Sequence, residues 1–287
     1  MMSPSLSIII PAYNEAPRLG GSLRTIFAYL AEQSLDSEVI VVDDGSTDDT
    51  VRVAEEGFAT VGRRTTAHLI RGQLNRGKGH VVRTGLLAAR APIALFSDAD
   101  LSTPITEMPK LVAPIRSGEY DIVLGSRALD RSLIGVHQSW RREQGGRMVN
   151  LLVRYATGMR IWDTQCGFKA FRMDVCRPVI EAGAIDRFGF DIELLYVAHL
   201  AGLRLFERAV RWNHNDGSKL SPLRDGLRML QEIRAIRAQA RRGFYEDAIR
   251  AVRAAAHHSG QPLFTPGDHP STESDVSPEL ASVERRI

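Results

Sequence analysis

Short apolar runs alternate with longer helical patterns along the first half of this 287-residue chain, and this alternation constrains the fold more than any other feature. The apolar runs are nearly continuous, as expected for strands of a parallel sheet that is covered on both faces. We predict strands within 7–10, 38–42, 67–70, 93–96 and 121–124, separated by helices at about 15–34, 48–59, 76–90 and 105–117.

The order strand–helix–strand predicts an α/β fold with an open, mostly parallel sheet, right-handed crossovers and flanking helices. The second half of the chain is less regular. Its patterns predict a helix at 140–158, a strand around 167–171, a helix at 189–202, a strand near 203–210 and one long helix from about 222 to 255.

We divide the chain into a sheet-based domain (1–217), a basic amphipathic helical extension (218–256) and a disordered tail (257–287) rich in Pro, Ser, Glu and Asp. The net charge of +3 gives no sign of a nucleic-acid partner, and we expect none. The two cysteines, Cys166 and Cys176, have neither metal-ligand spacing nor the number needed for a disulfide framework, which favours a reducing compartment. We find no basic, cleavable leader pattern and no run of about 18 uninterrupted apolar residues.

Polar residues gather directly after three of the predicted strands. Pro11–Glu15 (PAYNE) follows the first strand, Asp43–Asp48 (DDGSTD) follows the second, and Asp98–Asp100 (DAD) follows the strand at 93–96. Ligands of open α/β sheets bind beyond the carboxyl ends of the strands, so we expect these segments to line one crevice.

Asp98 and Asp100 are two residues apart, and their carboxylates can face one cation if the segment is extended or turning. Hard oxygen ligands suit Mg²⁺ or Mn²⁺, which usually share their coordination shell with water and substrate phosphates. A solvated loop or a helix cap is the structural alternative. The position after a buried strand, beside the other two motifs, favours the metal site.

Two further segments have both structural and functional interpretations. Asp44 is expected to face a nucleobase, while its neighbours Gly45, Ser46 and Thr47 would form a turn and cap the next helix. Asn75–His80 (NRGKGH) opens a helix whose backbone amides, with Arg76 and Lys78, would suit a diphosphate. Neither the Walker spacing nor a dinucleotide fingerprint is present, which argues against a P-loop and a nicotinamide cofactor.

In their order and spacing, these motifs resemble those of the family-2 inverting glycosyltransferases, which have the GT-A fold. Further motifs, between residues 125 and 222, are similar to those of the polyprenyl-phosphate sugar synthases, and among these the sequence looks closest to the dolichyl-phosphate β-glucosyltransferases. The resemblance covers about 5–240, and these further motifs are Gly125–Arg127 (GSR), Asp163–Lys169 (DTQCGFK), Phe190–Leu195 (FDIELL) and Gly217–Pro222 (GSKLSP).

The resemblance implies roles for individual residues. Catalysis would involve Asp100, Asp191 and Arg127, with Asp191 acting as a positioning residue or an accessory base; a helix N-cap is its structural alternative. Asp98 and Asp100 would hold the metal. The nucleotide sugar would contact Pro11, Tyr13, Glu15, Val42, Asp44, Lys78, Asp98 and Ala99, and the acceptor phosphate would contact Arg127, Arg141 and Lys219.

Two departures from the pattern bear on the donor. Mannose-transferring relatives usually read DADLQHP, whereas this chain has Ser102 in place of the glutamine, and Asn213 stands where they carry an arginine. Both departures favour UDP-glucose or a similar UDP-sugar. The implied reaction is transfer of glucose to a dolichyl-type polyprenyl phosphate, and the alternatives are GDP-mannose as donor or a soluble acceptor. A nucleotidyltransferase or a non-catalytic binding protein fits the motifs less well.

A phosphate acceptor changes what the enzyme must supply. A phosphate monoester has its second pKa near ~6, so it is largely dianionic at neutral pH and can attack without a general base. Cations that hold two anionic partners together are then needed more than a base, which agrees with the arginine-rich second half of the chain.

The second half also suggests a membrane surface as a partner. Between Lys219 and Arg253, nine Lys and Arg outnumber four Asp and Glu, and the helix at 140–158 carries apolar and aromatic residues beside arginines, as interfacial helices do. We expect a peripheral protein on the cytoplasmic face of a membrane. The alternative is that these helices pack on the core and expose a solvated arginine face.

Overall fold

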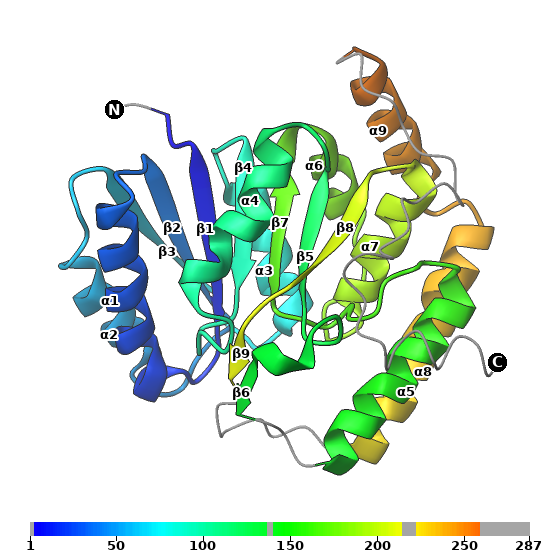
Figure 1. Cartoon of the computed structure of the whole chain (residues 1–287), viewed down its shortest axis with the longest axis horizontal. Helices are drawn as coiled ribbons and strands as arrows, with labels where there is room; N and C mark the ends of the chain where they lie inside the picture. Colours follow the sequence, from blue (N-terminus) through cyan, green and yellow to red (C-terminus); the bar gives the residue numbers. More distant parts are fainter. Residues whose placement is uncertain (1–2, 137–139, 214–221, 259–287) are drawn as a thin grey trace.

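The computed structural model describes residues 3–136, 140–213 and 222–258, with the backbone alone for 136, 140–147, 222–227 and 257–258. A seven-stranded sheet runs through the molecule in the order β3-β2-β1-β4-β7-β5-β8 (Figure 1). Strand β7 pairs antiparallel with β4 and β5, and the other neighbours pair parallel. The mostly parallel α/β sheet is therefore confirmed. Its strands are β1 (Leu6–Ala12), β2 (Ser37–Asp43), β3 (Thr65–Arg71), β4 (Ile93–Ser97), β5 (Ile122–Ser126), β7 (Phe168–Arg172) and β8 (Leu205–Ala209).

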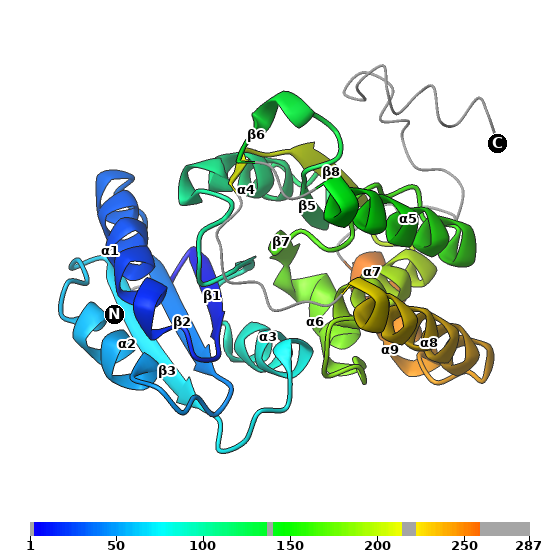
Figure 2. The same cartoon turned by 90° about the horizontal axis from the view of Figure 1, so that it is seen from below.

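Helices cover both faces of the sheet, which explains why its strands are continuously apolar. Ile8 and Ile10 of β1 pack in one core with α1 (Ala16–Glu32) and α4 (Met108–Arg116). Ile9 points the other way, into a core with α3 (Lys78–Ala88), α6 (Met173–Glu181) and α7 (Phe190–Ala201). Figure 2 shows these two layers on either side of the strands. Each of these isoleucines is fully buried and contributes about 1.5–3 kcal/mol of hydrophobic stabilisation.

The expected strands and the first three helices are found within a few residues of their predicted limits; α2 spans Thr50–Phe58. The helix expected at 105–117 opens as a short 3₁₀ turn, η1 (Ile105–Glu107), before α4 begins. The helix expected at 140–158 is α5 (Trp140–Thr157). Several short elements were not predicted: α6, the 3₁₀ turn η2 (Arg131–Leu133), and the two-stranded sheet of β6 (Ile134–Val136) and β9 (Trp212–Asn213).

The prediction of one long helix from 222 to 255 is wrong. The segment forms α8 (Pro222–Arg241) and α9 (Glu246–His258), and the chain turns between them at Gly243. Gly243 has a φ of 78°, a left-handed conformation that glycine adopts without steric cost and that ends a helix. The apolar spacing continues through this turn, which is why periodicity alone joined the two helices.

Both helices pack against the sheet domain through buried side chains. Ile236 of α8 and Val252 of α9 are fully buried in the core that also contains α6 and α7. Tyr245, in the turn between the helices, is 1 % exposed, and its hydroxyl lies 2.6 Å from Glu193 Oε1 and 2.7 Å from Gln239 Oε1. No helix in the described part of the chain is long and apolar enough to cross a bilayer.

Replacing Tyr245 with Phe tests this anchor. The variant loses a hydrogen bond to the buried Glu193 carboxylate, and we expect the free energy of unfolding in urea to fall by about 1–3 kcal/mol. Tyr155→Phe is the matched control, because Tyr155 is 91 % exposed and should leave stability unchanged. Equal stability of Tyr245→Phe and the wild type would show that the hydroxyl contributes nothing to docking of the two helices.

Candidate functional site

The sheet changes its winding direction between β1 and β4. The chain leaves β1 through α1 toward β2 on one side, whereas β4 pairs with the opposite edge of β1. Connections therefore diverge at the carboxyl ends of β1 and β4, which is where open α/β sheets bind their ligands. The PAYNE, DDGSTD and DAD segments all follow strands at this edge.

Asn14 locks the loops after β1 and β2 into one unit. Its backbone amide donates to Ser46 Oγ at 2.9 Å, and its side-chain Oδ1 accepts from the Thr47 amide at 2.9 Å. Asn14 has a φ of 54°, a left-handed conformation that Asn tolerates better than most residues. The first two sequence motifs are thus joined by polar contacts across 32 residues of chain.

Tyr13 and Glu15 present their side chains at this edge, whereas Pro11 and Val42 are buried, the latter in the hydrophobic core. Tyr13 is 43 % exposed. Burial raises the pKa of Glu15, and the charges of Asp100 and Asp98 add to this against the opposing effect of Arg18. Glu15 therefore lies within electrostatic reach of the DAD segment.

Asp44 connects the loop after β2 to the start of α3. Its Oδ1 accepts from the Arg76 amide at 2.9 Å and its Oδ2 accepts from the Gly77 amide at 2.8 Å, and the residue is 3 % exposed. The structure thus gives Asp44 a positioning role, and its contact with a nucleobase stays a prediction. Its neighbour Asp43 accepts from the Gly45 and Ser46 amides and builds the turn.

Three amides of the NRGKGH segment are paired within the protein. The Arg76 and Gly77 amides donate to Asp44, and the His80 amide donates to the Asp186 carbonyl at 3.1 Å. Contact of the rest of the segment with a diphosphate stays a prediction. A Cβ on Gly79 would lie 2.5 Å from the Ile185 carbonyl oxygen, so glycine permits this close packing. Lys78, by contrast, turns toward the DAD segment.

Two lysine–carboxylate pairs meet over the ring of Phe96. Lys78 Nζ lies 2.6 Å from Asp98 Oδ1, and Lys169 Nζ lies 2.7 Å from Asp191 Oδ1. The two ammonium groups lie 5.3 and 5.7 Å from the centroid of the Phe96 ring. The pairing of Phe96 with Lys169 between β4 and β7 sets this arrangement. The antiparallel strand β7 therefore brings a cation into the centre of the site.

Asp191 lies in the first turn of α7, but the N-cap is Gly189, so Asp191 is not a capping residue. It is 4 % exposed. Burial raises the pKa of Asp191, although Lys169 and Lys78 act in the opposite direction. Burial would lower the pKa of Lys78, but Asp98 and Asp191 outweigh this effect and raise it. A buried carboxylate held between two lysines can position a cationic group or accept a proton.

Asp98 and Asp100 follow β4 and are held by backbone contacts. The Asp98 amide donates to the Gly167 carbonyl at 3.0 Å, and Asp100 Oδ1 accepts from the Ser102 amide at 2.9 Å. Two hard carboxylate ligands two residues apart fit a site for Mg²⁺ or Mn²⁺. Lys78 already pairs with Asp98 Oδ1, so a bound metal would have to share or replace that contact. Ala99, between them, is buried at 5 % exposure. Within the described residues no group of three or more His, Cys, Asp and Glu side chains is arranged to hold a metal.

Gly167 makes room for the Asp98 carboxylate. A Cβ at this position would lie 2.0 Å from Asp98 Oδ2, so Gly167→Ala must displace Asp98. For the sugar transfer that the sequence resemblance implies, we expect about a hundredfold lower kcat/KM. Misplacing a group at the reaction centre by about 1 Å has effects of this size. Gly62→Ala is the matched control, since its Cβ would meet only Ala31 at an ordinary 3.8 Å. Steady-state kinetics of both variants makes the comparison, and unchanged kinetics of Gly167→Ala would contradict the expectation.

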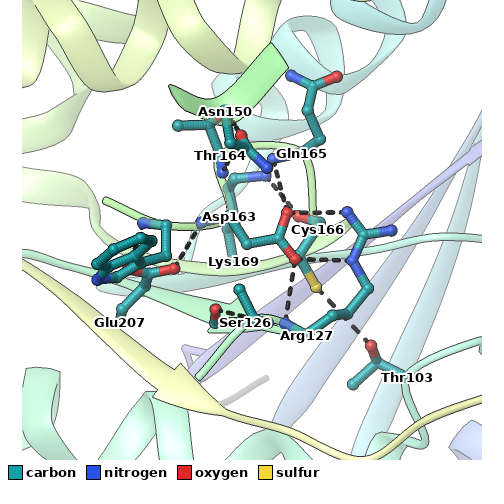
Figure 3. A network of polar contacts seen from close by, with 12 residues as sticks. Thr103, Ser126, Arg127, Asn150, Asp163, Thr164, Gln165, Cys166, Lys169 and Glu207 are labelled. Carbon is teal, nitrogen blue, oxygen red and sulfur yellow. Dashed lines mark hydrogen bonds and ion pairs between the residues drawn. The ribbon is translucent and has the colours of Figure 1, made fainter. Parts of the chain in front are cut away.

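Arg127, at the end of β5, forms a forked ion pair with Asp163. The Nε and Nη2 atoms of Arg127 lie 2.7 and 2.8 Å from the two carboxylate oxygens, and the Arg127 amide donates to Asp163 Oδ2 at 3.0 Å. Figure 3 shows the guanidinium facing this carboxylate. Burial would lower the pKa of Arg127, but Asp163 raises it, and the guanidinium stays charged. The third guanidinium nitrogen, Nη1, takes no part in this ion pair.

Sequence reasoning missed Lys169 and Asp163 as site residues, although both belong to the DTQCGFK motif. A lysine inside the apolar strand run Gly167–Phe171 was the available signal, because a buried lysine requires a partner. Arg141 and Lys219 were expected to bind phosphate, but the side chain of the first and all of the second lie outside the described residues. The two positions thought to select the donor lie side by side, since the Asn213 amide donates to the Ser102 carbonyl at 2.8 Å.

Comparisons with known proteins identify the family and the fold. The model of the family described as glycosyl transferase family 2 matches residues 7–179. The chain is 38 % identical to the dolichyl-phosphate β-glucosyltransferase of Drosophila melanogaster over 244 residues, which cover 80 % of this chain and 74 % of that protein. It is 33 % identical to the human protein of the same name over 81 % of this chain and 74 % of that protein.

A solved structure with a similar fold is glucosyl-3-phosphoglycerate synthase from Mycobacterium tuberculosis in complex with Mn²⁺, UDP-glucose and phosphoglyceric acid. The TM-score is 0.59 at 20 % sequence identity, over 81 % of this chain and 79 % of that one. At this identity the likeness concerns the fold.

Proposed function

Because this chain belongs to glycosyl transferase family 2 and is a glycosyltransferase of GT-A fold, we propose that it transfers glucose from UDP-glucose to a dolichyl-type polyprenyl phosphate with inversion. The observation that carries this proposal is a group of charged residues at the β1/β4 edge, made of the carboxylates Asp98, Asp100 and Asp191 and the cations Lys78 and Lys169. It combines ligands for a diphosphate-bound metal with cations, in a chain whose similar relatives are named for glucosyl transfer to dolichyl phosphate.

The donor would occupy the β1/β4 edge. Tyr13 and Glu15 reach it from the loop after β1, and Asp98 and Asp100 reach it from β4. Bound by Asp98 and Asp100, Mg²⁺ or Mn²⁺ would neutralise negative charge on the departing nucleoside diphosphate. Support for this ion comes from the donor set and from the Mn²⁺ and UDP-glucose in the name of the mycobacterial structure.

The cations of this chain would hold the acceptor. Arg127 is oriented by Asp163, and its Nη1 remains outside that ion pair. Lys78 would add positive charge between donor and acceptor. A dianionic phosphate attacks without giving up a proton, so Asp191 would position Lys78 and Lys169 and need not act as a base. Arg141 and Lys219 remain proposed phosphate ligands.

Transfer of label from a nucleotide sugar to a polyprenyl phosphate tests the proposal. Purified protein is incubated with polyprenyl phosphate, Mn²⁺ and either labelled UDP-glucose or labelled GDP-mannose, and the organic phase is counted. We expect label from UDP-glucose alone, in a β-linked product. Label from GDP-mannose alone would show that GDP-mannose, and not UDP-glucose, is the donor. Label that enters only water-soluble products with a phosphorylated small acceptor would reject the lipid acceptor.

The proposed acceptor requires contact with a membrane surface, for which α5 provides an apolar face. Met148 is 59 % exposed and Tyr155 is 91 % exposed, and Leu151 and Leu152 are each 37 % exposed. Such a face suits the headgroup–acyl boundary of a bilayer. We place the protein at the cytoplasmic face, which agrees with the two free, buried cysteines.

Leu151→Asp combined with Leu152→Asp should weaken binding to vesicles that contain anionic lipid at least about tenfold, because two apolar side chains are lost from the interface and two negative charges are added. Flotation with vesicles measures the bound fraction. Leu74→Asp is the control, because Leu74 is 76 % exposed in the loop after β3 and lies outside the proposed surface. Equal binding of the double variant and this control would remove α5 from the membrane contact.

A further inference from the structure

Glu207 is a buried carboxylate beside the site. It belongs to none of the sequence motifs. It lies on β8, opposite Leu124 of β5, and is 3 % exposed. Its two oxygens accept from two consecutive backbone amides, Oε2 from Trp162 at 2.7 Å and Oε1 from Asp163 at 2.7 Å. The Ser126 hydroxyl also hydrogen-bonds to this carboxylate. The two amide bonds require the carboxylate to act as an acceptor, whereas the Ser126 hydroxyl can donate or accept.

The segment that Glu207 holds is the one that orients Arg127. Figure 3 shows Glu207 and Arg127 on opposite sides of Asp163, with the Asp163 carboxylate turned toward the guanidinium. Asn150 of α5 binds the next residue, since its Oδ1 accepts from Thr164 Oγ1 at 3.1 Å, and Arg154 stacks on the Trp162 ring at 3.6 Å. The segment 162–164 is thus fixed from β8 on one side and from α5 on the other.

We infer that Glu207 is a positioning residue for the acceptor phosphate: it holds the 162–163 backbone so that Asp163 can present Arg127. This inference rests on the proposed function, because it assigns Arg127 to the acceptor. Glu207 acts through Asp163 and Arg127 and touches no substrate. Its loss should therefore raise the KM for the acceptor and lower the corresponding kcat/KM, while the KM for the nucleotide sugar changes little.

The ionisation of Glu207 gives this role a signature in pH. The pKa of Glu207 is raised to about 7: burial is the largest cause and the charge of Asp163 adds to it, while the hydrogen bonds from Trp162, Ser126 and Asp163 act in the opposite direction. The charged groups around it are Asp163, the Arg127 paired with Asp163, and Arg154 above Trp162. A protonated carboxyl carries its proton on one oxygen, which makes that oxygen a much weaker acceptor for the amide it faces. The hydrogen bonds that Glu207 accepts from the 162–163 backbone, called here the Glu207 anchor, are complete above about pH 7 and weaken below it.

Glu207→Gln tests the inference because the two side chains have nearly the same shape. Its NH₂ group would face a backbone N–H, so the variant resembles the protonated wild type at every pH. At pH 8 we expect acceptor kcat/KM to be about 10–100-fold below that of the wild type. The ratio of wild type to variant should fall toward one as the pH decreases to 6. Taking the ratio cancels the titration of the acceptor phosphate, which has a pKa near ~6.

Glu38→Gln is the matched control. Glu38 is 1 % exposed and accepts from the Arg90 amide at 2.7 Å. It lies near the amino end of β2, whereas the site lies at the carboxyl ends of the strands. A ratio that stays constant with pH, a loss shared by Glu38→Gln, or an equal rise in the KM for the nucleotide sugar would each assign Glu207 a general structural role and overturn the inference.

A second measurement separates this inference from the proposed function. If the wild type transfers no glucose to polyprenyl phosphate, the proposed function fails, and the anchor is read without substrate from hydrogen exchange of the peptide that contains Trp162 and Asp163. Protection relative to the intrinsic exchange rate should be lower in Glu207→Gln than in the wild type at pH 8, and the two should converge at pH 6. Equal protection at pH 8 would overturn the inference.

Discussion

Asp100→Ala is expected to abolish glucosyl transfer and its dependence on divalent metal together. Asp100 lies directly after β4, where its Oδ1 is held by the Ser102 amide at 2.9 Å, and with Asp98 it forms the proposed metal site. A metal that neutralises a leaving diphosphate lowers the barrier by several kcal/mol. We therefore expect kcat/KM to fall by at least about a thousandfold.

The rate of transfer is measured as a function of Mn²⁺ concentration, with chelator as the zero point. Asp247→Ala is the control, because Asp247 is an exposed carboxylate in α9 and should leave both the rate and the metal dependence unchanged. Turnover of Asp100→Ala at the wild-type rate in the presence of chelator would falsify the assignment of Asp100 as a metal ligand.

Lys169→Met is expected to give the largest loss of stability. Lys169 is 1 % exposed, pairs with the buried Asp191 at 2.7 Å and also donates to the Cys166 carbonyl. Removing one partner of a buried ion pair leaves an uncompensated charge and costs about 3–5 kcal/mol. For a chain of this size, such a loss lowers the melting temperature by roughly 6–20 °C.

The pH dependence of that loss distinguishes charge from packing. The pKa of Asp191 is already raised by burial, and without Lys169 it rises further. Between the ordinary pKa of Asp and this raised value, the folded state binds a proton that the unfolded state does not, so stability falls as pH rises through that window. The loss in Lys169→Met should therefore be smaller in acid than at neutral pH.

Arg250→Met provides the comparison for an exposed ion pair. Arg250 and Asp247 have side chains that are 73 % and 91 % exposed, and exposed pairs contribute little to stability. Thermal unfolding of both variants at several pH values makes the measurement. A loss in Lys169→Met that matches Arg250→Met, or that does not change with pH, would show that Asp191 does not depend on Lys169 for its charge.

Two buried ion pairs, one formed by a lysine and one by an arginine, supply positive charge to this site. Lys169 with Asp191 and Arg127 with Asp163 each place a cation near the proposed phosphates, and each cation is fixed by a carboxylate from another element. A cation that is already oriented loses less conformational freedom when a phosphate binds. We expect the carboxylates to contribute to phosphate binding through this fixed geometry. Arg127, with its side chain 29 % exposed, would contact a phosphate, while the buried Lys169 would act through its charge.

The fold class could be read from the sequence because it depends on local patterns. Continuous apolar runs such as Ile8–Ile10 mark strands that are covered on both faces, and the polar residues after them mark the ligand edge. The family resemblance rests likewise on ordered motifs, and the comparisons confirm it. The α8–α9 turn escaped this reasoning because Gly243 interrupts the helix without interrupting the apolar spacing.

The contacts inside the site depended on the tertiary structure. Asp44 could have faced a ligand or a backbone, and only its position against α3 shows that its two oxygens bind the Arg76 and Gly77 amides. Lys169 enters the site because β7 is inserted antiparallel between β4 and β5, which no local pattern predicts.

The sequence by itself therefore determined the α/β class, the family and the edge of the sheet where the site lies, because strand order and motif order are properties of the chain. The tertiary structure decided which carboxylate meets which cation. Such pairs as Asp163 with Arg127, or Glu207 with the 162–163 backbone, join residues 36 and 44 or more positions apart. Their partners are chosen by which buried charges come to lie within hydrogen-bond distance once the sheet has formed.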